Sequence, residues 1–318
     1  MNLVNYISFP GLGIGEIRIN KIAFEVGPFV VRWYGIIITA AIILGFILAC
    51  VRAKKIGVSF DSMLDYAIFV ILFSIVGARL YYVAFSGETY DSFYDVIAIW
   101  NGGLAIYGGL IGGFIATAIV SKVKKISLVK MLDVLAPCAM LGQAVGRFGN
   151  FANAEAYGYN PAKIAQYENN IFRMDIRAEG SDFVRHTLPT FLFESVWNIV
   201  GLIIILLVID KIKKYDGQVI LFYITWYGFG RAWIEMLRSD SLYLFDLRVS
   251  SLLGFLCFFA GVILMIIFGS KARRKALDSV PYESIYSDSA EIKNSAKNPN
   301  EADVEDSKNT GGENSNDT

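Results

Sequence analysis

The chain has 318 residues, of which 55% are hydrophobic and 18% charged, and its mean hydropathy is +0.48. These values exclude an ordinary soluble domain and indicate an integral membrane protein. The 29 basic and 29 acidic residues cancel, and the basic ones flank apolar runs in short groups, which argues against nucleic acid as a partner. Three cysteines in separate apolar runs and a single histidine predict no disulfide framework, no metal site and no cofactor.

The N-terminal residues 1–28 are mixed in polarity and rich in glycine, and we expect an interfacial arm lying on the bilayer. They lack the basic region, apolar stretch and cleavage site of a secretory signal peptide. A helix needs about 20 apolar residues to cross a bilayer. Segments of this kind predict an all-α fold of seven transmembrane helices at about 29–51, 63–86, 103–121, 128–149, 189–209, 217–237 and 249–269.

Basic residues predict the orientation, because lysines and arginines concentrate in cytoplasmic loops. They follow the first, third, fifth and seventh spans, whereas the other loops are acidic or mixed in charge. The N-terminus is therefore expected outside and the C-terminus in the cytoplasm. Residues 150–188 would form a small external cap within a transmembrane domain of residues 29–270. Residues 271–318 would form a disordered cytoplasmic tail, since from Asp278 onward ten acidic residues accompany only three lysines.

The most unusual stretch is 142–158, which reads GQAVGRFGNFANAEAYG. An arginine beside the hydrocarbon core costs about 2.5–3.5 kcal/mol on insertion scales, so Arg147 needs a partner or a function. Because glycine permits positive φ and close backbone approach, we expect the helix to break here and to turn Asn150, Asn153 and Glu155 toward one point. A snorkelling side chain would explain Arg147 alone. The four polar side chains together predict a site for a polar ligand.

Other polar residues of the apolar segments fall at the same depth. Tyr227, Arg231, Glu235 and Arg238 recur at helical spacing in the sixth span and so share one face. At 1.5 Å per residue, Arg231 lies about 21 Å from the inner end of that span, in the outer half. The alternative is an Arg231–Glu235 pair that merely neutralises itself. Further polar residues expected at this depth are Arg32, Tyr34, Arg79, Tyr107, Arg147 and Glu194.

Arginines, tyrosines and amides in the outer leaflet suit an anionic lipid headgroup, since arginine holds a phosphate with two parallel hydrogen bonds. No serine–histidine or cysteine–histidine pair is evident, so the nucleophile of a reaction would come from a substrate. The protein would then stabilise charge on a leaving phosphate. Two other classes of protein use similar residues: a transporter or flippase for an anionic lipid or solute, and a non-catalytic lipid-binding scaffold.

Glycines of the third span, Gly112 and Gly113 among them, are expected to serve helix packing.

Residues 146–158 match the signature G-R-x-G-N-F-x-N-x-E-x-x-G at every specified position. Through it the chain resembles the prolipoprotein diacylglyceryl transferase family. The resemblance covers essentially all of residues 1–270, including Trp33-Tyr34-Gly35, 102–109, Pro189–Glu194 and Tyr227–Glu235. It implies an enzyme of the bacterial cell membrane whose active site faces the outer leaflet. Such enzymes move the diacylglyceryl group of phosphatidylglycerol to the lipobox cysteine of a preprolipoprotein signal peptide, forming a thioether and releasing glycerol phosphate.

Carried over by position, the resemblance implies catalytic roles for Tyr107, Arg147, Arg231 and Glu235, the two arginines holding the phosphate. It implies a phosphatidylglycerol site formed by Arg147, Asn150, Asn153, Glu155, Gly158, Tyr34 and Tyr227. Two positions depart from the family pattern: Tyr107 replaces a histidine often proposed as the base for the thiol, and Leu188 replaces the histidine that usually precedes Pro189. A phenol has a reference pKa near 10. Tyr107 could therefore act as the base only if nearby arginines lowered this pKa, and Glu155 and Glu235 are the competing candidates.

Overall fold

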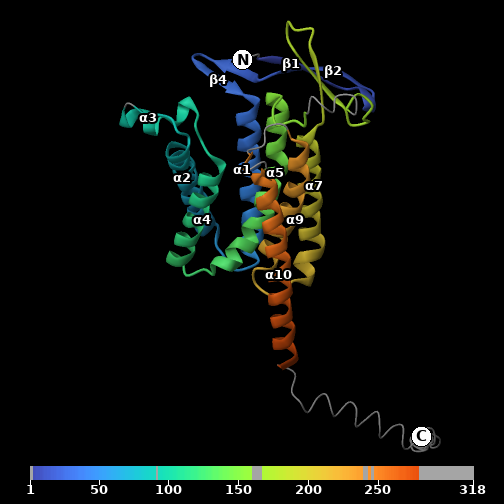
Figure 1. Cartoon of the computed structure of the whole chain (residues 1–318). Helices are drawn as coiled ribbons and strands as arrows, with labels where there is room; N and C mark the ends of the chain where they lie inside the picture. The colour runs from blue at the N-terminus through green and yellow to red at the C-terminus, as the bar shows by residue number, and fades with distance from the viewer. Residues whose placement is uncertain (1–2, 91, 160–166, 239–242, 245–246, 279–318) are drawn as a thin grey trace, which may run out of the picture. The chain divides into compact units, whose positions relative to one another are not determined.

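The structure is a computed structural model that describes residues 3–90, 92–159, 167–238, 243–244 and 247–278 (Figure 1). It divides into a compact unit of residues 1–266 and a second unit from residue 267 onward. In the second unit the described residues continue a helix to Asp278. The rest of the predicted acidic tail lies outside the described residues, as do residues 160–166 of the predicted cap.

Among the described residues, six helices are long and apolar enough to cross a membrane. They are α1 (Trp33–Lys54), α2 (Phe60–Phe85), α4 (Ile106–Val123), α5 (Leu128–Asn153), α7 (Thr190–Ile204), which continues through a π-helical turn (Ile205–Ile209) into α8 (Asp210–Ile212), and α10 (Val249–Asp278). They coincide with six of the seven predicted spans. The predicted span 217–237 corresponds to α9 (Gln218–Ile234), which is 17 residues long and ends in a 3₁₀ turn at Glu235–Leu237.

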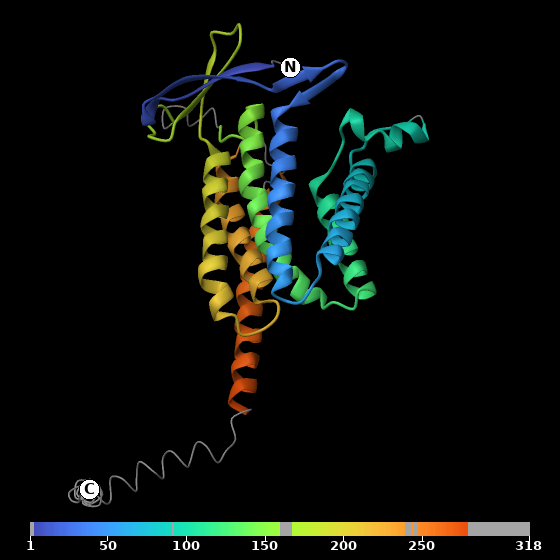
Figure 2. The same cartoon turned by 180° about the vertical axis from the view of Figure 1, so that it is seen from behind.

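Helix α5 is the central helix of the main unit, because it packs against α1, α7 and α9. Helices α2 and α4 form a separate antiparallel pair, visible in both views (Figure 1, Figure 2). This pair meets α1 and α5 through a buried cluster around Met63, Tyr66 and Met131. Serine N-caps fix where α2 and α5 begin, since Ser59 Oγ accepts the Ser62 N–H at 3.2 Å and the Ser127 hydroxyl performs the same role on α5.

The expectation of an all-α fold is wrong outside the helical bundle. A four-stranded antiparallel sheet has the order β2–β1–β5–β6, formed by β1 (Val4–Phe9), β2 (Ile14–Asn20), β5 (Met174–Ala178) and β6 (Val184–Thr187). Two hairpins are formed by β3 (Ile22–Val26) with β4 (Phe29–Arg32) and by β7 (Tyr243–Leu244) with β8 (Leu247–Arg248). A short helix α3 (Phe93–Ile97) and the 3₁₀ turns Pro10–Leu12 and Ile99–Asn101 complete the described elements.

The predicted arm and the predicted cap share this sheet, because β1 pairs with both β2 and β5. Asn5 lies opposite Ala178, a contact that no local pattern reveals. The inner face of the sheet buries Ile7 and Ile176 against Phe191 at the start of α7, with Phe151 of α5 packed alongside. The sheet therefore fixes the end of α5 relative to the beginning of α7.

Glycines bring α2 and α4 into backbone contact. A Cβ added to Gly108 would lie 2.2 Å from Gly77 O, and one added to Gly112 would lie 2.1 Å from Phe73 O. A Cβ on Gly113 would meet Ser74 Oγ at 2.8 Å. Such distances leave no room for a side chain, as expected where small residues let helices approach closely. The packing roles predicted for Gly112 and Gly113 are confirmed.

We expect Gly112→Ala to destabilise the α2–α4 pair by about 1–3 kcal/mol, the usual cost of overpacking a close interface. Gly109→Ala on the same helix is the matched control, because its Cβ would lie 3.5 Å from Ser74 O, an ordinary contact. Thermal unfolding in detergent measures both variants. Equal stability of the two variants would contradict the packing role of Gly112.

Candidate active site

Five charged side chains from α5, α7 and the end of α9 meet close to the sheet. Glu194 is central: its Oε1 accepts a hydrogen bond from Arg147 Nη2 at 2.5 Å and lies 3.4 Å from Arg231 Nη1. Arg231 Nη2 also pairs with Glu235 Oε2 at 2.5 Å, as their predicted shared helix face requires. Arg238 lies 4.0 Å from Glu194 Oε2 and 3.9 Å from Glu235 Oε2. We call these five residues the arginine–glutamate cluster.

The two carboxylates of the cluster are buried, and within its five residues the guanidinium groups outnumber them. The side chains of Glu194 and Glu235 are each 3% exposed, and those of the three arginines are 13–20% exposed. Three guanidinium groups against two carboxylates leave a net charge of +1. Desolvating ions costs several kcal/mol each unless partners compensate. Three guanidinium groups around one carboxylate would offer an anionic ligand several charged donors at once. An isolated Arg231–Glu235 pair is therefore an incomplete description, because Arg231 also shares Glu194 with Arg147.

A reciprocal tryptophan pair fixes how α7 and α9 align. The Trp197 and Trp226 rings stack at 4.2 Å, and each indole N–H donates to the other residue's carbonyl oxygen, at 3.0 and 2.9 Å. Gly201 and Gly230 make room, since a Cβ on either would lie within 2.4 Å of the opposite indole nitrogen. Because the two helices run antiparallel past this pair, Glu194 on α7 comes level with Arg231 on α9.

A chain of hydrogen bonds extends the cluster along the predicted polar stretch. Arg147 Nη1 donates to Asn150 Oδ1 at 3.1 Å, and Asn150 Nδ2 donates to Glu155 Oε1 at 3.1 Å. Asn153 Nδ2 donates to the same Glu155 oxygen at 3.2 Å. Glu155 is exposed, unlike the two cluster carboxylates. The structure therefore brings the four polar residues of this stretch together, as predicted, with Arg147 as the link to the buried charges.

Helix α5 ends within the predicted stretch 142–158, but not at one of its glycines. Helix α5 continues through Gly142, Gly146 and Gly149 and ends only at Asn153. The chain turns at Ala154, whose φ of 51° is left-handed. A non-glycine residue in this region is strained by about 1–3 kcal/mol, and such residues cluster at functional sites.

Two glycines of the signature act by leaving room for neighbours. A Cβ on Gly149 would lie 2.8 Å from the ring of Tyr34, so this glycine lets Tyr34 pack on the end of α5. A Cβ on Gly158 would lie 2.6 Å from Leu237 O, in the 3₁₀ turn that begins with Glu235. Gly158 also exchanges two backbone hydrogen bonds with Leu188, at 2.9 and 2.8 Å. Leu188, which departs from the family pattern, is buried beside Gly158.

Tyr227, Tyr107 and Arg79 lie in different surroundings. Tyr227 is one turn before Arg231 on α9 and stacks on Tyr223 at 5.9 Å. Tyr107 is in the first turn of α4, 6.3 Å from the Tyr81 ring, and makes no hydrogen bond or ion pair within the described part of the chain. Arg79, expected at the same depth, donates instead to the four backbone carbonyl oxygens of Asp95, Val96, Gly102 and Gly103 at 2.6–3.0 Å. It orders the α2–α4 connection.

The depth of Glu194 in the outer half of the membrane was predicted from the sequence, but its central position among the three arginines was not. The available signal was a carboxylate in the first turns of an apolar segment, which is costly unless it is paired. Its partners come from two other helices, so no spacing within α7 identifies them. The Trp197–Trp226 pair was not predicted for the same reason.

Comparison with known proteins decides the family. Residues 21–267 match the sequence model of the family described as "Prolipoprotein diacylglyceryl transferase". The chain belongs to the prolipoprotein diacylglyceryl transferase family. Phosphatidylglycerol--prolipoprotein diacylglyceryl transferase 1 of Clostridium perfringens is 42% identical over 259 residues, 80% of this chain and 97% of the relative. The Streptococcus agalactiae transferase is 42% identical over 250 residues (78% and 95%), and that of Streptococcus uberis is 38% identical over 266 residues (83% and 98%).

The match to this transferase family contains the entire arginine–glutamate cluster and the hydrogen-bonded branch to Glu155. It also contains Tyr34, Tyr107, Gly158 and Tyr227, the other residues predicted for the site. The chain spans nearly the full length of these relatives, so the family assignment covers the transferase as a whole.

Proposed function

We propose that this protein is a phosphatidylglycerol--prolipoprotein diacylglyceryl transferase acting in lipoprotein maturation. The observation that carries the proposal is the arginine–glutamate cluster, in which three arginines surround the buried Glu194, in a chain 38–42% identical to relatives of that name. Phosphatidylglycerol would supply an anionic phosphate, and a prolipoprotein would supply the nucleophile. The acceptor would be the thiol of a lipobox cysteine in the signal peptide.

In the proposed reaction the cysteine sulfur forms a bond to the glycerol carbon of the diacylglyceryl group. The bond from that carbon to the phosphate oxygen breaks, and glycerol phosphate leaves with the bonding electron pair. The thiol proton passes to a base. Arg147 and Arg231 would hold the phosphate in both states and stabilise the charge that develops on it, because their guanidinium groups are already fixed by Glu194 and Glu235.

The remaining predicted residues would shape the headgroup site. Asn150, Asn153 and Glu155 form one hydrogen-bonded unit with Arg147 and would bind the glycerol hydroxyls of the headgroup. Tyr34 and Tyr227 would border the site, since Tyr34 packs on the end of α5 and Tyr227 lies one turn before Arg231. Gly158 would act indirectly, through the close backbone approach that positions the turn of Glu235.

We propose that Tyr107, acting as its phenolate, is the base, with Glu155 and Glu235 as competitors. Glu235 already pairs with Arg231, and Glu155 accepts two amide hydrogen bonds, whereas the hydroxyl of Tyr107 is uncommitted within the described part of the chain. Tyr107→Phe should then lower turnover by about 10²–10⁴-fold, the usual contribution of a general base. Turnover measured against pH, with Glu155→Gln as the comparison, tests this role. A Phe variant with wild-type turnover would exclude Tyr107.

The activity is tested by incubating the purified protein with phosphatidylglycerol labelled in its acyl chains and a peptide that carries a lipobox cysteine. Label should move to the peptide and stay bound after hydroxylamine treatment, because a thioether resists it and a thioester does not. A peptide with serine in place of the cysteine is the control. Absence of transfer by a folded preparation would contradict the proposed function.

We also propose seven crossings of the bacterial plasma membrane, with α9 as the sixth. Its 17 residues and the 3₁₀ turn that follows span about 31 Å, close to the roughly 30 Å hydrocarbon core. The arginine–glutamate cluster would then face the outer leaflet, and the C-terminal tail would be cytoplasmic. The proposed domains are the N-terminal arm of residues 1–28, the catalytic domain of residues 29–270 with its cap, and the tail.

Reporter fusions test this orientation. Fusions after Lys55, Lys125 and Lys214 are expected to report the cytoplasm, and fusions after Glu88 and Arg238 the exterior. The two fusions after Lys214 and Arg238 test whether α9 crosses the membrane. If both fusions report the same compartment, α9 does not cross.

A further inference from the structure

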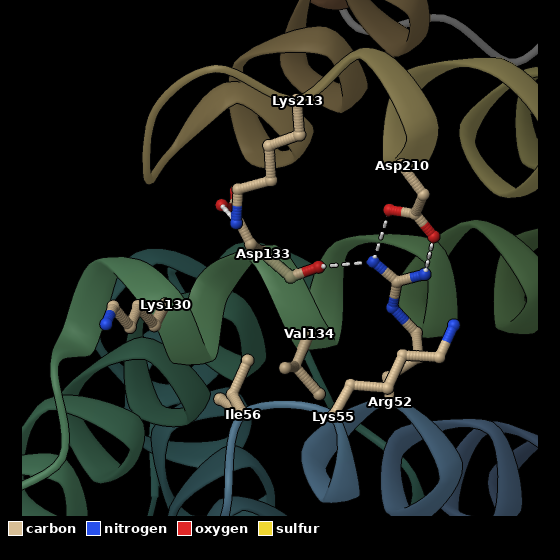
Figure 3. A pocket seen from close by; sticks show the side chains of 8 residues that line it. All are labelled: Arg52, Lys55, Ile56, Lys130, Asp133, Val134, Asp210 and Lys213. Atoms are coloured by element: carbon tan, nitrogen blue, oxygen red, sulfur yellow. Dashed lines mark hydrogen bonds and ion pairs between the residues drawn. The ribbon is translucent and has the colours of Figure 1, made fainter.

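A second charged site lies at the opposite end of α5 from the arginine–glutamate cluster. It is a hollow of about 180 Å³ whose polar lining consists of Arg52, Lys55, Lys130, Asp133, Asp210 and Lys213 (Figure 3). We call it the basic hollow. Asp133 precedes Arg147 by 14 positions on α5, which is about 21 Å along the helix. Since one water needs only about 10–15 Å³ of such space, the hollow has room for a phosphate group.

Both carboxylates of the basic hollow are already occupied by structural partners. Asp210 accepts two hydrogen bonds from Arg52, at 2.5 and 2.9 Å. Asp133 accepts the N–H groups of Gly217 and Ile220 at 2.7 and 2.9 Å, and so caps the start of α9 from a different helix. These contacts hold α1, α5 and the turn before α9 together.

The cations of the hollow outnumber its carboxylates by four to two. Lys213 Nζ lies 2.8 Å from Asp133 and 3.5 Å from the exposed Asp216, which does not line the hollow. Lys130 Nζ comes only within 3.8 Å of the same Asp216. Lys55 is exposed and makes no ion pair with any residue that the structure describes. The buried Nε of Arg52 likewise has no hydrogen-bond partner among those residues. The hollow therefore has positive charge and hydrogen-bond donors to offer an anion.

We propose that the basic hollow binds a phosphate-bearing anion, with Lys55 and Lys130 as its accessible ligands. Because the hollow lies where the transmembrane helices end, the phosphate would come from the headgroup of an anionic lipid or from free phosphate in solution. A phosphate here would join the end of α1 to the start of α5 and to Lys213 before α9. The site is separate from the proposed transferase site and does not depend on its activity.

The test compares Lys55→Gln/Lys130→Gln with the control Lys54→Gln/Lys122→Gln. The control removes two exposed lysines, at the ends of α1 and α4, that do not line the hollow. Binding of phosphatidic acid to the full chain is measured by native mass spectrometry in neutral detergent. Phosphatidylcholine serves as the uncharged comparison, and inorganic phosphate is titrated in a thermal-shift assay. Size-exclusion profiles and melting temperatures without added ligand verify that both variants fold.

The Lys55/Lys130 variant is expected to bind about tenfold more weakly than the control variant. Weakening for phosphatidic acid alone assigns a lipid headgroup, and weakening for inorganic phosphate alone assigns free phosphate. Weaker binding of both ligands shows that the phosphate group alone is enough for recognition by the hollow. Any phosphatidic acid bound at the arginine–glutamate cluster is common to both variants. The difference in binding between the variants therefore measures binding at the hollow. Equal binding of both ligands by the two variants would overturn the proposal.

Discussion

Arg147→Lys and Arg231→Lys are each expected to lower the turnover of diacylglyceryl transfer by about a hundredfold or more. Lysine keeps the charge but presents a point cation, whereas arginine presents a planar fork with several fixed donors. Arg231 uses that fork to reach Glu194 and Glu235 together, and Arg147 uses it to reach Glu194 and Asn150. Losing one preorganised donor to a developing charge costs about 2.7–4 kcal/mol of transition-state stabilisation.

Turnover and detergent thermal stability are measured on the same lysine variants. Arg18→Lys provides the control, because Arg18 is an exposed arginine whose partner, Glu179 at 3.3 Å, is also exposed. If the cluster arginines served only to neutralise their glutamates, lysine would replace them with near-normal turnover. That outcome, in variants that remain folded, would remove both arginines from the active site.

Glu194→Gln is expected to lower the free energy of unfolding by about 3–5 kcal/mol, the usual loss when one member of a buried ionic group is removed. Glu194 is 3% exposed and lies within 4.0 Å of Arg147, Arg231 and Arg238. Neutralising it raises the cluster's net charge from +1 to +2 without changing its size. The two arginines that we assign to the phosphate would also lose their shared anchor, so turnover should fall as well.

Unfolding by added sodium dodecyl sulfate, followed by tryptophan fluorescence, measures the loss, since Trp197 and Trp226 lie between the same helices. Glu179→Gln is the matched control, because it removes the same carboxylate from an exposed pair, and we expect little change from it. A Glu194→Gln protein as stable as this control would mean that the cluster is held together without its central carboxylate.

The sequence by itself determined the features that depend on local pattern. Six apolar segments predicted helices of membrane-crossing length because a chain in hydrocarbon must satisfy its backbone hydrogen bonds within each helix. Helical spacing placed Arg231 and Glu235 on one face, and they do pair. The polar stretch after Arg147 predicted a gathering of amides and a carboxylate, which the structure also has.

Only the tertiary structure decided which distant residues meet. Residues 1–28 looked like a separate arm because short strands give a weak signal, and the pairing of Asn5 with Ala178 joins β1 to a segment far along the chain. Glu194 lies at the centre of the cluster because the Trp197–Trp226 pair fixes the alignment of α7 along α9. Periodicity shows which face of a helix is polar, but the level at which two polar faces meet depends on packing between the helices.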